Sequence, residues 1–200
     1  VGQVGAVDAR VPAVEALTGA PSLMFLGGLH WPPNADALLT FIRDSWPQVR
    51  AAYPAATLTS IGRDDSPVAE ECRAAPGVRL TGWVPEIESF VAQSRVLVVP
   101  MRAGSGMRVK ILEAMARSVP VVSTTVGCEG IDVEPGRHLL VADDAAAFAE
   151  AVIQVLQDDA LANRLRHEAR RLVLERYDVP AVSARVLDAL GRLELPSNVR

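Results

Sequence analysis

The chain has 200 residues, of which 50% are hydrophobic and 22% charged, and its formal net charge is −4. That length and composition suffice for one globular domain with a full hydrophobic core. The negative net charge does not support bulk nucleic-acid binding. No apolar run approaches the roughly 18 residues that cross a bilayer, and the sequence shows no basic-then-apolar leader, so we expect a cytoplasmic protein. Cys72 and Cys128 lack the spacing of a metal or redox site.

Strand and helix signals alternate along the chain after residue 21. Short runs rich in apolar or β-branched residues predict strands at residues 23–26, 57–61, 78–80, 96–99, 119–122 and 138–141, and glycine or proline closes the first, second and fourth of them. Apolar residues at helical spacing predict helices at about residues 34–52, 67–74, 85–91, 107–115, 144–156, 159–177 and 178–190. This alternation predicts an α/β fold, a Rossmann-like doubly wound parallel sheet of about six strands with helices on both faces and a helical C-terminal end.

The two ends of the chain differ from its middle. Residues 1–21 have no strong hydrophobic period, and we interpret them as a linker from an upstream domain, with an ordinary flexible terminus as the alternative. Residues 22–200 are then one domain. Five basic residues fall on the helix predicted at residues 159–177 and spread around much of it, so we interpret them as solvated surface: Arg164, Arg166, His167, Arg170 and Arg171.

A glycine loop at residues 104–106 lies between the fourth predicted strand and the next helix. In a parallel sheet this loop would lie at the carboxyl ends of the strands, where such folds bind ligands. Arg102, Arg108 and Lys110 surround the start of the helix, no acidic residue lies among them, and Lys110 is the only lysine in the chain. Cations are unfavourable at a helix N-terminus, but a phosphate would be held by the cations and by free backbone N–H groups. The pattern predicts an anion site or, alternatively, a solvated basic face that binds nothing.

The run GSGMRVKILEAMARSVPVVST at residues 104–124, with GCEGI at 127–131, resembles the donor-binding half of the retaining GT-B glycosyltransferases of group 1. Members of that family carry two glutamates in the form E-x7-E, then A-M/L-A and P-V-V. Glu113 matches the second glutamate, whereas Ser105 stands where the first is expected, and we interpret this as a variant of the family's pattern. The resemblance extends over about residues 23–190 and identifies residues 22–200 as a Rossmann-like domain that binds a nucleotide sugar.

The resemblance implies roles for individual residues. Glu113 would accept hydrogen bonds from the ribose hydroxyls of the nucleotide, which suits a carboxylate because that group only accepts. The alternative is a surface ion pair of Glu113 with Lys110 or Arg117. The loop at residues 82–84 would lie beside the base, where glycine allows the backbone to approach closely. Trp83 in this loop would either stack on a ligand or cover the core.

The first predicted turn departs from the family. Members place an arginine and a lysine after the first strand to hold the diphosphate, but residues 27–34 contain neither. Arg108 and Lys110 would supply that charge from the other side of the site, and His30 and Arg63 are weaker candidates. The predicted donor-binding residues are Gly82, Trp83, Val84, Gly104, Ser105, Gly106, Met107, Arg108, Lys110 and Glu113.

The resemblance implies the donor-binding half of a retaining glycosyltransferase that moves a sugar from a nucleotide-diphosphate sugar to an unidentified acceptor. The family places the acceptor site and much of the catalytic machinery on another domain, so we expect this fragment alone to be inactive and assign no catalytic residue. That missing acceptor domain is the expected partner, and any peripheral membrane association would run through it. No cofactor and no metal are expected, since the chain has no D-x-D motif. The alternatives are a non-catalytic nucleotide-binding module and a nucleotide-sugar epimerase of the same two-domain fold.

Overall fold

The structure is a computed structural model that describes residues 6–17 and 19–192. Residues 1–5 and 18 of the predicted linker, and residues 193–200 of the predicted domain, lie outside the described residues. The strands are β1 (Ser22–Leu26), β2 (Thr57–Ile61), β3 (Val78–Leu80), β4 (Val96–Val99), β5 (Val121–Ser123) and β6 (Leu140–Val141). The helices are α1 (Pro32–Thr40), α2 (Trp46–Ala52), α3 (Ala69–Ala74), α4 (Glu88–Gln93), α5 (Val109–Ala116), α6 (Ala145–Gln157), α7 (Asp159–Arg176) and α8 (Val179–Gly191), with a π-helical turn η1 (Phe41–Ser45) between α1 and α2.

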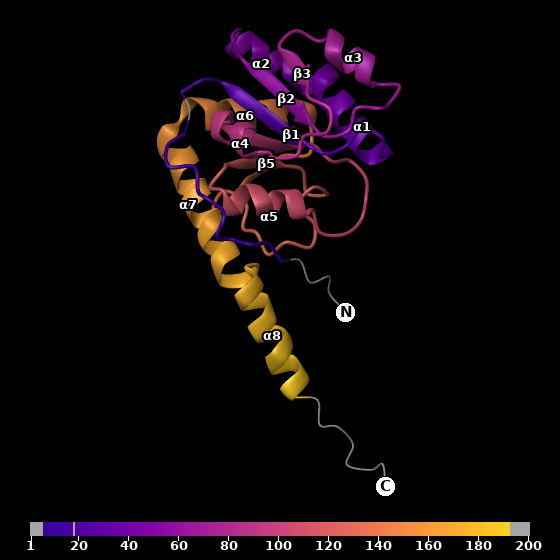
Figure 1. Cartoon of the computed structure of the whole chain (residues 1–200). Helices are drawn as coiled ribbons and strands as arrows, with labels where there is room; N and C mark the ends of the chain where they lie inside the picture. The colour runs from indigo at the N-terminus through magenta and orange to yellow at the C-terminus, as the bar shows by residue number, and fades with distance from the viewer. Residues whose placement is uncertain (1–5, 18, 193–200) are drawn as a thin grey trace.

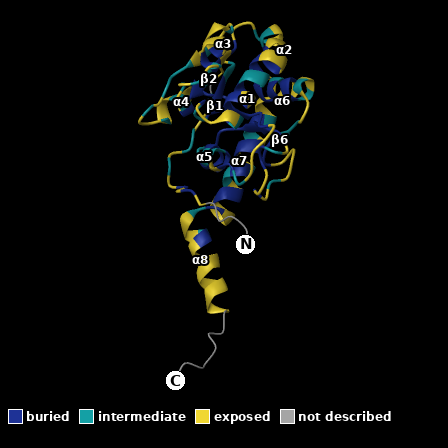
Figure 2. Cartoon of the chain, turned by 90° about the vertical axis from the view of Figure 1, so that its right-hand side faces the viewer, coloured by how far each residue is buried: buried dark blue, intermediate teal, exposed yellow. Residues whose placement is uncertain are grey.

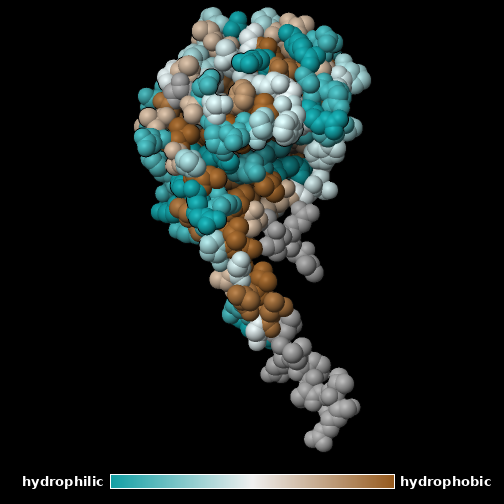
Figure 3. Space-filling view, viewed as in Figure 1, coloured by the Kyte–Doolittle hydropathy of each residue, from teal (hydrophilic) through white to brown (hydrophobic). Residues whose placement is uncertain are grey.

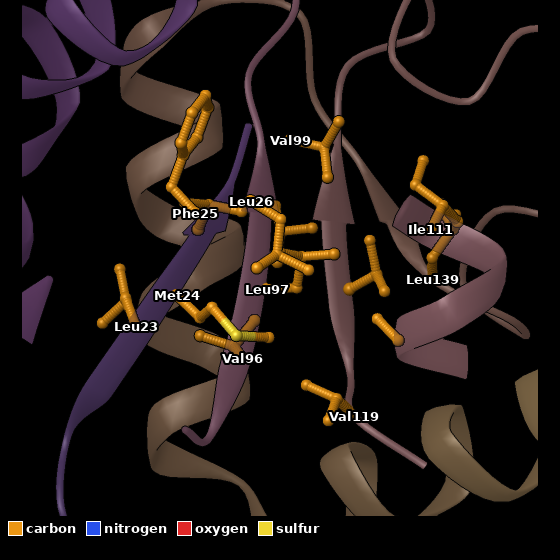
Figure 4. Packing of buried hydrophobic residues seen from close by; sticks show 14 of the residues in the cluster. Leu23, Met24, Phe25, Leu26, Val96, Leu97, Val99, Ile111, Val119 and Leu139 are labelled. Atoms are coloured by element: carbon orange, nitrogen blue, oxygen red, sulfur yellow. The ribbon is translucent and has the colours of Figure 1, made fainter. Parts of the chain in front are cut away.

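The six strands form one parallel sheet in the order β3-β2-β1-β4-β5-β6, which confirms the predicted doubly wound fold. Helices α1, α2, α3 and α6 lie on one face of the sheet, and α4, α5 and α7 lie on the other (Figure 1). Because both faces are covered, every residue of β4 is buried. Figure 4 shows Phe25 of β1, Leu97 of β4 and Ile111 of α5 among the packed core side chains. The strand order reverses between β1 and β4, so their carboxyl ends mark the place where such a fold binds ligands.

The helix predicted at residues 34–52 changes its winding partway along. The backbone N–H of Trp46 donates to the carbonyl of Phe41, five residues earlier, which makes the π-helical turn η1. Pro47 accounts for this wide turn, because proline has no N–H to donate to the carbonyl of Arg43 four residues before it. The single helix predicted for this segment is therefore divided into α1, η1 and α2.

The strands predicted at residues 57–61 and 78–80 have the observed bounds of β2 and β3. The strand predicted to begin at residue 119 begins instead at Val121, directly after Pro120, which has no N–H to donate to a sheet. The helix predicted to begin at Met107 begins two residues later as α5. These differences change the ends of elements and leave the order of strands and helices as predicted.

Residues 6–17, most of the described part of the predicted linker, pack along α7. The N–H of Val7 donates to the carbonyl of Tyr177 at 2.9 Å. The guanidinium of Arg166 donates to two carbonyls of the segment, those of Val14 at 2.6 Å and Glu15 at 2.9 Å. Arg166 is buried by these contacts, so the prediction of a solvated side chain is wrong for this residue.

Helix α8 extends away from the body of the domain (Figure 1). Most of it is exposed (Figure 2), and Val182 is its one buried residue. Hydrophobic side chains form part of its surface (Figure 3), and the exposed large ones are Val179, Val186, Leu187 and Leu190. Over residues 6–17 and 19–192, no helix has both the length and the apolar character that crossing a bilayer requires.

Candidate functional site

Three turns meet at the carboxyl ends of β1, β2 and β3, and each contains a glycine. Gly62 has a φ of +139°, and a Cβ atom on it would lie 2.7 Å from the carbonyl carbon of Gly27. The N–H of Gly62 donates to the carbonyl of Gly82 at 3.1 Å. Only glycine permits this conformation and this close approach of two backbones. The site therefore begins as a surface of backbone groups next to the reversal of strand order.

Lys110 reaches this surface from α5. Its Nζ donates to Oδ1 of Asn34 at 3.0 Å and lies 5.1 Å from the centroid of the Phe25 ring. A Cβ atom on Gly27 would lie 2.9 Å from the same Nζ. The structure thus places the only lysine of the chain at the first turn, which has neither arginine nor lysine of its own.

The charge on Lys110 is poorly compensated. Burial, together with the positive charge of Arg108, lowers the pKa of Lys110 to about 8. None of the ion pairs formed by the described residues includes Lys110 or Arg108. Two neighbouring cations without a carboxylate are unfavourable in a partly buried place unless an anion joins them.

Arg108 shapes the glycine loop from inside. It is only 5% exposed, and its Nη1 donates to the carbonyls of Ser105, at 2.8 Å, and of Gly106. A Cβ atom on Gly104 would lie 2.8 Å from Nη2, so the glycine makes room for the guanidinium. Nε and Nη2 of Arg108 are buried and have no hydrogen-bond partner among the residues that the structure describes. Met107, before Arg108, is half-buried and packs against the core.

The Glu113 carboxylate makes no hydrogen bond or ion pair with any residue that the structure describes. Both partners expected for a surface pair are engaged elsewhere, because Lys110 donates to Asn34 and Arg117 donates to Glu88 at 3.0 Å. The alternative of a surface ion pair is therefore wrong. Glu113 is three residues beyond Lys110 on α5, where side chains are neighbours on the helix surface.

The loop at residues 82–84 has one buried and one exposed side. Val84 packs against the core, whereas Trp83 is 71% exposed, so of the two alternatives for Trp83 the one in which it covers the core is wrong. The sequence reasoning missed a second tryptophan, Trp31, which is 42% exposed and lies 3.7 Å from the position of a Cβ atom on Gly104. Periodicity could not single out Trp31, because it lies in the turn before α1.

Other predicted cations do not join the site. Arg102 donates to Thr40 Oγ1 at 3.0 Å and lies 3.7 Å from Asp36, so it is held against α1. Arg63 forms an ion pair with Asp65 at 2.6 Å. Within the part of the chain that the structure describes, no group of three or more histidine, cysteine, aspartate or glutamate side chains could hold a metal ion.

Asn34 is a site residue that the sequence reasoning overlooked. After two prolines it signals the start of a helix, and it is indeed the third residue of α1. Its side chain instead points across the site, where Nδ2 donates to the carbonyl of Gly28 at 3.1 Å and Oδ1 accepts from Lys110. No signal in the sequence links residues 34 and 110.

Comparisons with known proteins show the family to which the chain belongs. The family model for glycosyl transferases group 1 matches residues 20–158. A phosphatidyl-myo-inositol mannosyltransferase from Mycobacterium leprae is 27% identical to the chain. The match covers 87% of this chain and 50% of the mannosyltransferase. The chain spans about half or less of the curated relatives that it matches.

Solved structures share the fold. The structure of Anabaena Alr3699/HepE in complex with UDP and glucose has a TM-score of 0.73 at 15% identity, over 94% of this chain and 55% of that one. The C-terminal domain of LpcC, a glycosyl transferase group 1 family protein from Francisella tularensis, has a TM-score of 0.69 at 16% identity, over 86% of this chain and 99% of that one. With the family model matching well over half of its residues, the chain belongs to the group 1 glycosyltransferases and has the Rossmann-like fold of a GT-B domain.

Proposed function

We propose that this chain is the donor-binding half of a retaining glycosyltransferase and holds a nucleotide-diphosphate sugar at the carboxyl ends of β1 and β4. One observation carries the proposal: Lys110 lies at the first turn and Arg108 at the glycine loop, and neither has a carboxylate partner among the described residues. An anion would offset the cost of bringing these charges together. The UDP in the complex of the structurally similar Alr3699/HepE is such an anion.

Each part of the nucleotide has a proposed partner. The diphosphate binds Lys110, Arg108 and the backbone N–H groups at the start of α5, which also stabilise the negative charge that develops on the leaving group. The Glu113 carboxylate, which has no partner among the described residues, accepts hydrogen bonds from the ribose hydroxyls. The loop at residues 82–84 lies beside the base, and the exposed ring of Trp83 is available for stacking.

The proposal predicts that the purified chain binds a nucleoside diphosphate without a metal ion. The cations that face the phosphates are side chains, so affinity should be unchanged by excess EDTA. A thermal-shift screen of UDP, GDP and ADP identifies the base, and calorimetric titration with and without EDTA measures the affinity. A large loss of affinity on chelation, restored by magnesium or manganese, would contradict the proposed site.

The acceptor is proposed to bind to a second domain. The chain matches only about half the length of its relatives, and the apolar side chains of α8 are exposed rather than packed on the body of this domain. We therefore expect the 200-residue chain to bind the donor without transferring sugar to an acceptor. Assays with a radiolabelled donor and the purified chain check this. Sustained sugar transfer, with contaminating enzymes excluded, would contradict the proposal that the acceptor binds to a second domain.

A different function has one observation in its favour. Ser105 stands in the glycine loop where the family pattern has its first glutamate, and it is exposed. A binding module that no longer transfers sugar would tolerate that change. Turnover by a full-length parent protein, with a Ser105→Ala variant as the control, separates the transferase from the binding module.

A further inference from the structure

Asn34 is a buried polar residue to which the proposed roles assign no task. It is 6% exposed and sits in the first turn of α1. Its Nδ2 donates to the carbonyl of Gly28 at 3.1 Å, and its Oδ1 accepts from Nζ of Lys110 at 3.0 Å. The orientation of the amide follows from its partners, because an ammonium group only donates and a carbonyl only accepts. One side chain therefore connects the first turn to the only lysine of the chain.

The groups in contact with the Lys110 ammonium bear no negative charge. The ammonium lies over the Phe25 ring of β1 and donates to the Asn34 amide of α1. It also fills the space beside Gly27, where a Cβ atom would lie 2.9 Å from it. The charged group that acts on it is Arg108, which is also a cation. The oxygen that holds Lys110 in place thus belongs to an uncharged group.

Two other titratable side chains, those of His30 and Glu113, belong to the first turn and to α5, the elements that Lys110 joins. The ring of His30 folds over Gly28, 2.5 Å from where a Cβ atom of that glycine would be. Glu113 lies three residues along α5 from Lys110. Neither makes a hydrogen bond or ion pair with Lys110, whose hydrogen bond goes to Asn34.

An uncharged acceptor suits a phosphate site for two physical reasons. A carboxylate at position 34 would form an ion pair with Lys110 and cancel much of the charge that attracts the ligand. An amide leaves that charge uncompensated. The hydrogen bond also removes rotamer freedom from the lysine before the ligand arrives, which reduces the entropy cost of binding.

We propose that Asn34 is the positioning residue of the phosphate site: its buried amide holds the Lys110 ammonium at the Gly27–Gly28 turn and leaves the charge of Lys110 to the ligand. This inference rests on the proposed function, because it concerns the same diphosphate. It adds a residue to that site from α1, on the opposite face of the sheet from α5.

Calorimetric titration with inorganic pyrophosphate in EDTA tests the proposal, since pyrophosphate probes the phosphate site without base or ribose. At pH 7, Asn34→Asp should bind pyrophosphate at least about tenfold more weakly than the wild type, because its carboxylate competes for the ammonium. Asp36→Asn is the matched control: it lies on the same helix, faces Arg102, and should bind as the wild type does.

The pH profile distinguishes positioning from a merely structural role. Wild-type affinity should fall as the pH rises through about 8, where Lys110 loses its proton. In Asn34→Asp this fall should move to higher pH, because the new carboxylate stabilises the protonated lysine. Lys110→Arg is the reference, since arginine stays charged and its profile reports the titration of pyrophosphate alone.

The outcomes separate this inference from the proposed function. Equal affinities and equal profiles for the wild type and Asn34→Asp would overturn the assignment of Asn34 and leave the phosphate site intact. No binding of pyrophosphate by the wild type would overturn the proposed function, and this inference with it. If circular dichroism shows that Asn34→Asp does not fold, Asn34→Ala replaces it, with weaker binding expected and no shift of the profile to higher pH.

Discussion

Replacing Lys110 by methionine should stabilise the ligand-free protein at pH 7 and weaken its binding of nucleoside diphosphates. The pKa of Lys110 is lowered from 10.5 to about 8, so its charged form costs the folded state about 3 kcal/mol at neutral pH. Methionine removes that cost but leaves Oδ1 of Asn34 without its donor, which costs roughly 1–2 kcal/mol. The net gain should be about 1–2 kcal/mol, or about 2–8 °C in Tm. Loss of one charged hydrogen-bond donor should weaken diphosphate binding about 10- to 100-fold.

The stability gain should depend on pH with a definite sign. Below about pH 8 both the folded and the unfolded chain hold the proton of Lys110, and the full cost is present. Between about pH 8 and pH 10.5 the unfolded chain binds a proton that the folded chain has released, so wild-type stability rises with pH. The difference between Lys110→Met and the wild type should therefore shrink across this interval in urea titrations. A variant less stable than the wild type at pH 7 would show that the ammonium stabilises the empty site.

Replacing Glu113 by glutamine should weaken nucleoside diphosphate binding by roughly 30- to 150-fold. Each hydrogen bond from a ribose hydroxyl to a carboxylate is worth roughly 1.5–3 kcal/mol, and competition from water reduces the pair to about 2–3 kcal/mol. Stability should change little, because the carboxylate has no partner among the residues that the structure describes. Calorimetric titration with the nucleoside diphosphate and chemical denaturation measure the two effects.

Comparing the affinities for pyrophosphate and for a nucleoside separates the role of Glu113 at the ribose from that of Lys110 at the phosphates. Glu113→Gln should leave pyrophosphate affinity unchanged, whereas Lys110→Met should reduce pyrophosphate affinity and change nucleoside affinity little. Glu150→Gln is the matched control, since Glu150 is an exposed glutamate on α6, across the sheet from α5. Unchanged nucleoside diphosphate affinity in both site variants would refute the assignment of Lys110 and Glu113.

The strands were predictable because they are short runs between polar or turn residues. Residues 57–61 and 78–80 are two such runs, and their ends coincide with β2 and β3. The π-helical turn before α2 was predictable in principle from Pro47, which lies inside a segment with helical periodicity. The buried position of Arg166 was not, because it depends on residues 14 and 15 crossing α7.

The sequence predicted which charged residues cluster near the candidate site, but it did not predict which side chains contact one another there. The absence of acidic residues around Arg108 and Lys110 indicated an anion site, and the structure brings both side chains to the predicted end of the sheet. Arg102 belongs to the same cluster in sequence, yet it lies against α1. The contact between Asn34 and Lys110 joins residues 76 positions apart, and such a pair follows from how α5 packs on the sheet rather than from local spacing.

The most direct test of the phosphate site uses the fact that Lys110 is the only lysine. In protein labelled with ¹³C-lysine, a single Cε signal reports the protonation of this one side chain by NMR. The free protein should show a titration midpoint near pH 8, and saturating nucleoside diphosphate should raise it because a phosphate favours the charged ammonium. A signal whose midpoint and position do not change when the nucleoside diphosphate is bound would contradict a phosphate site at Lys110.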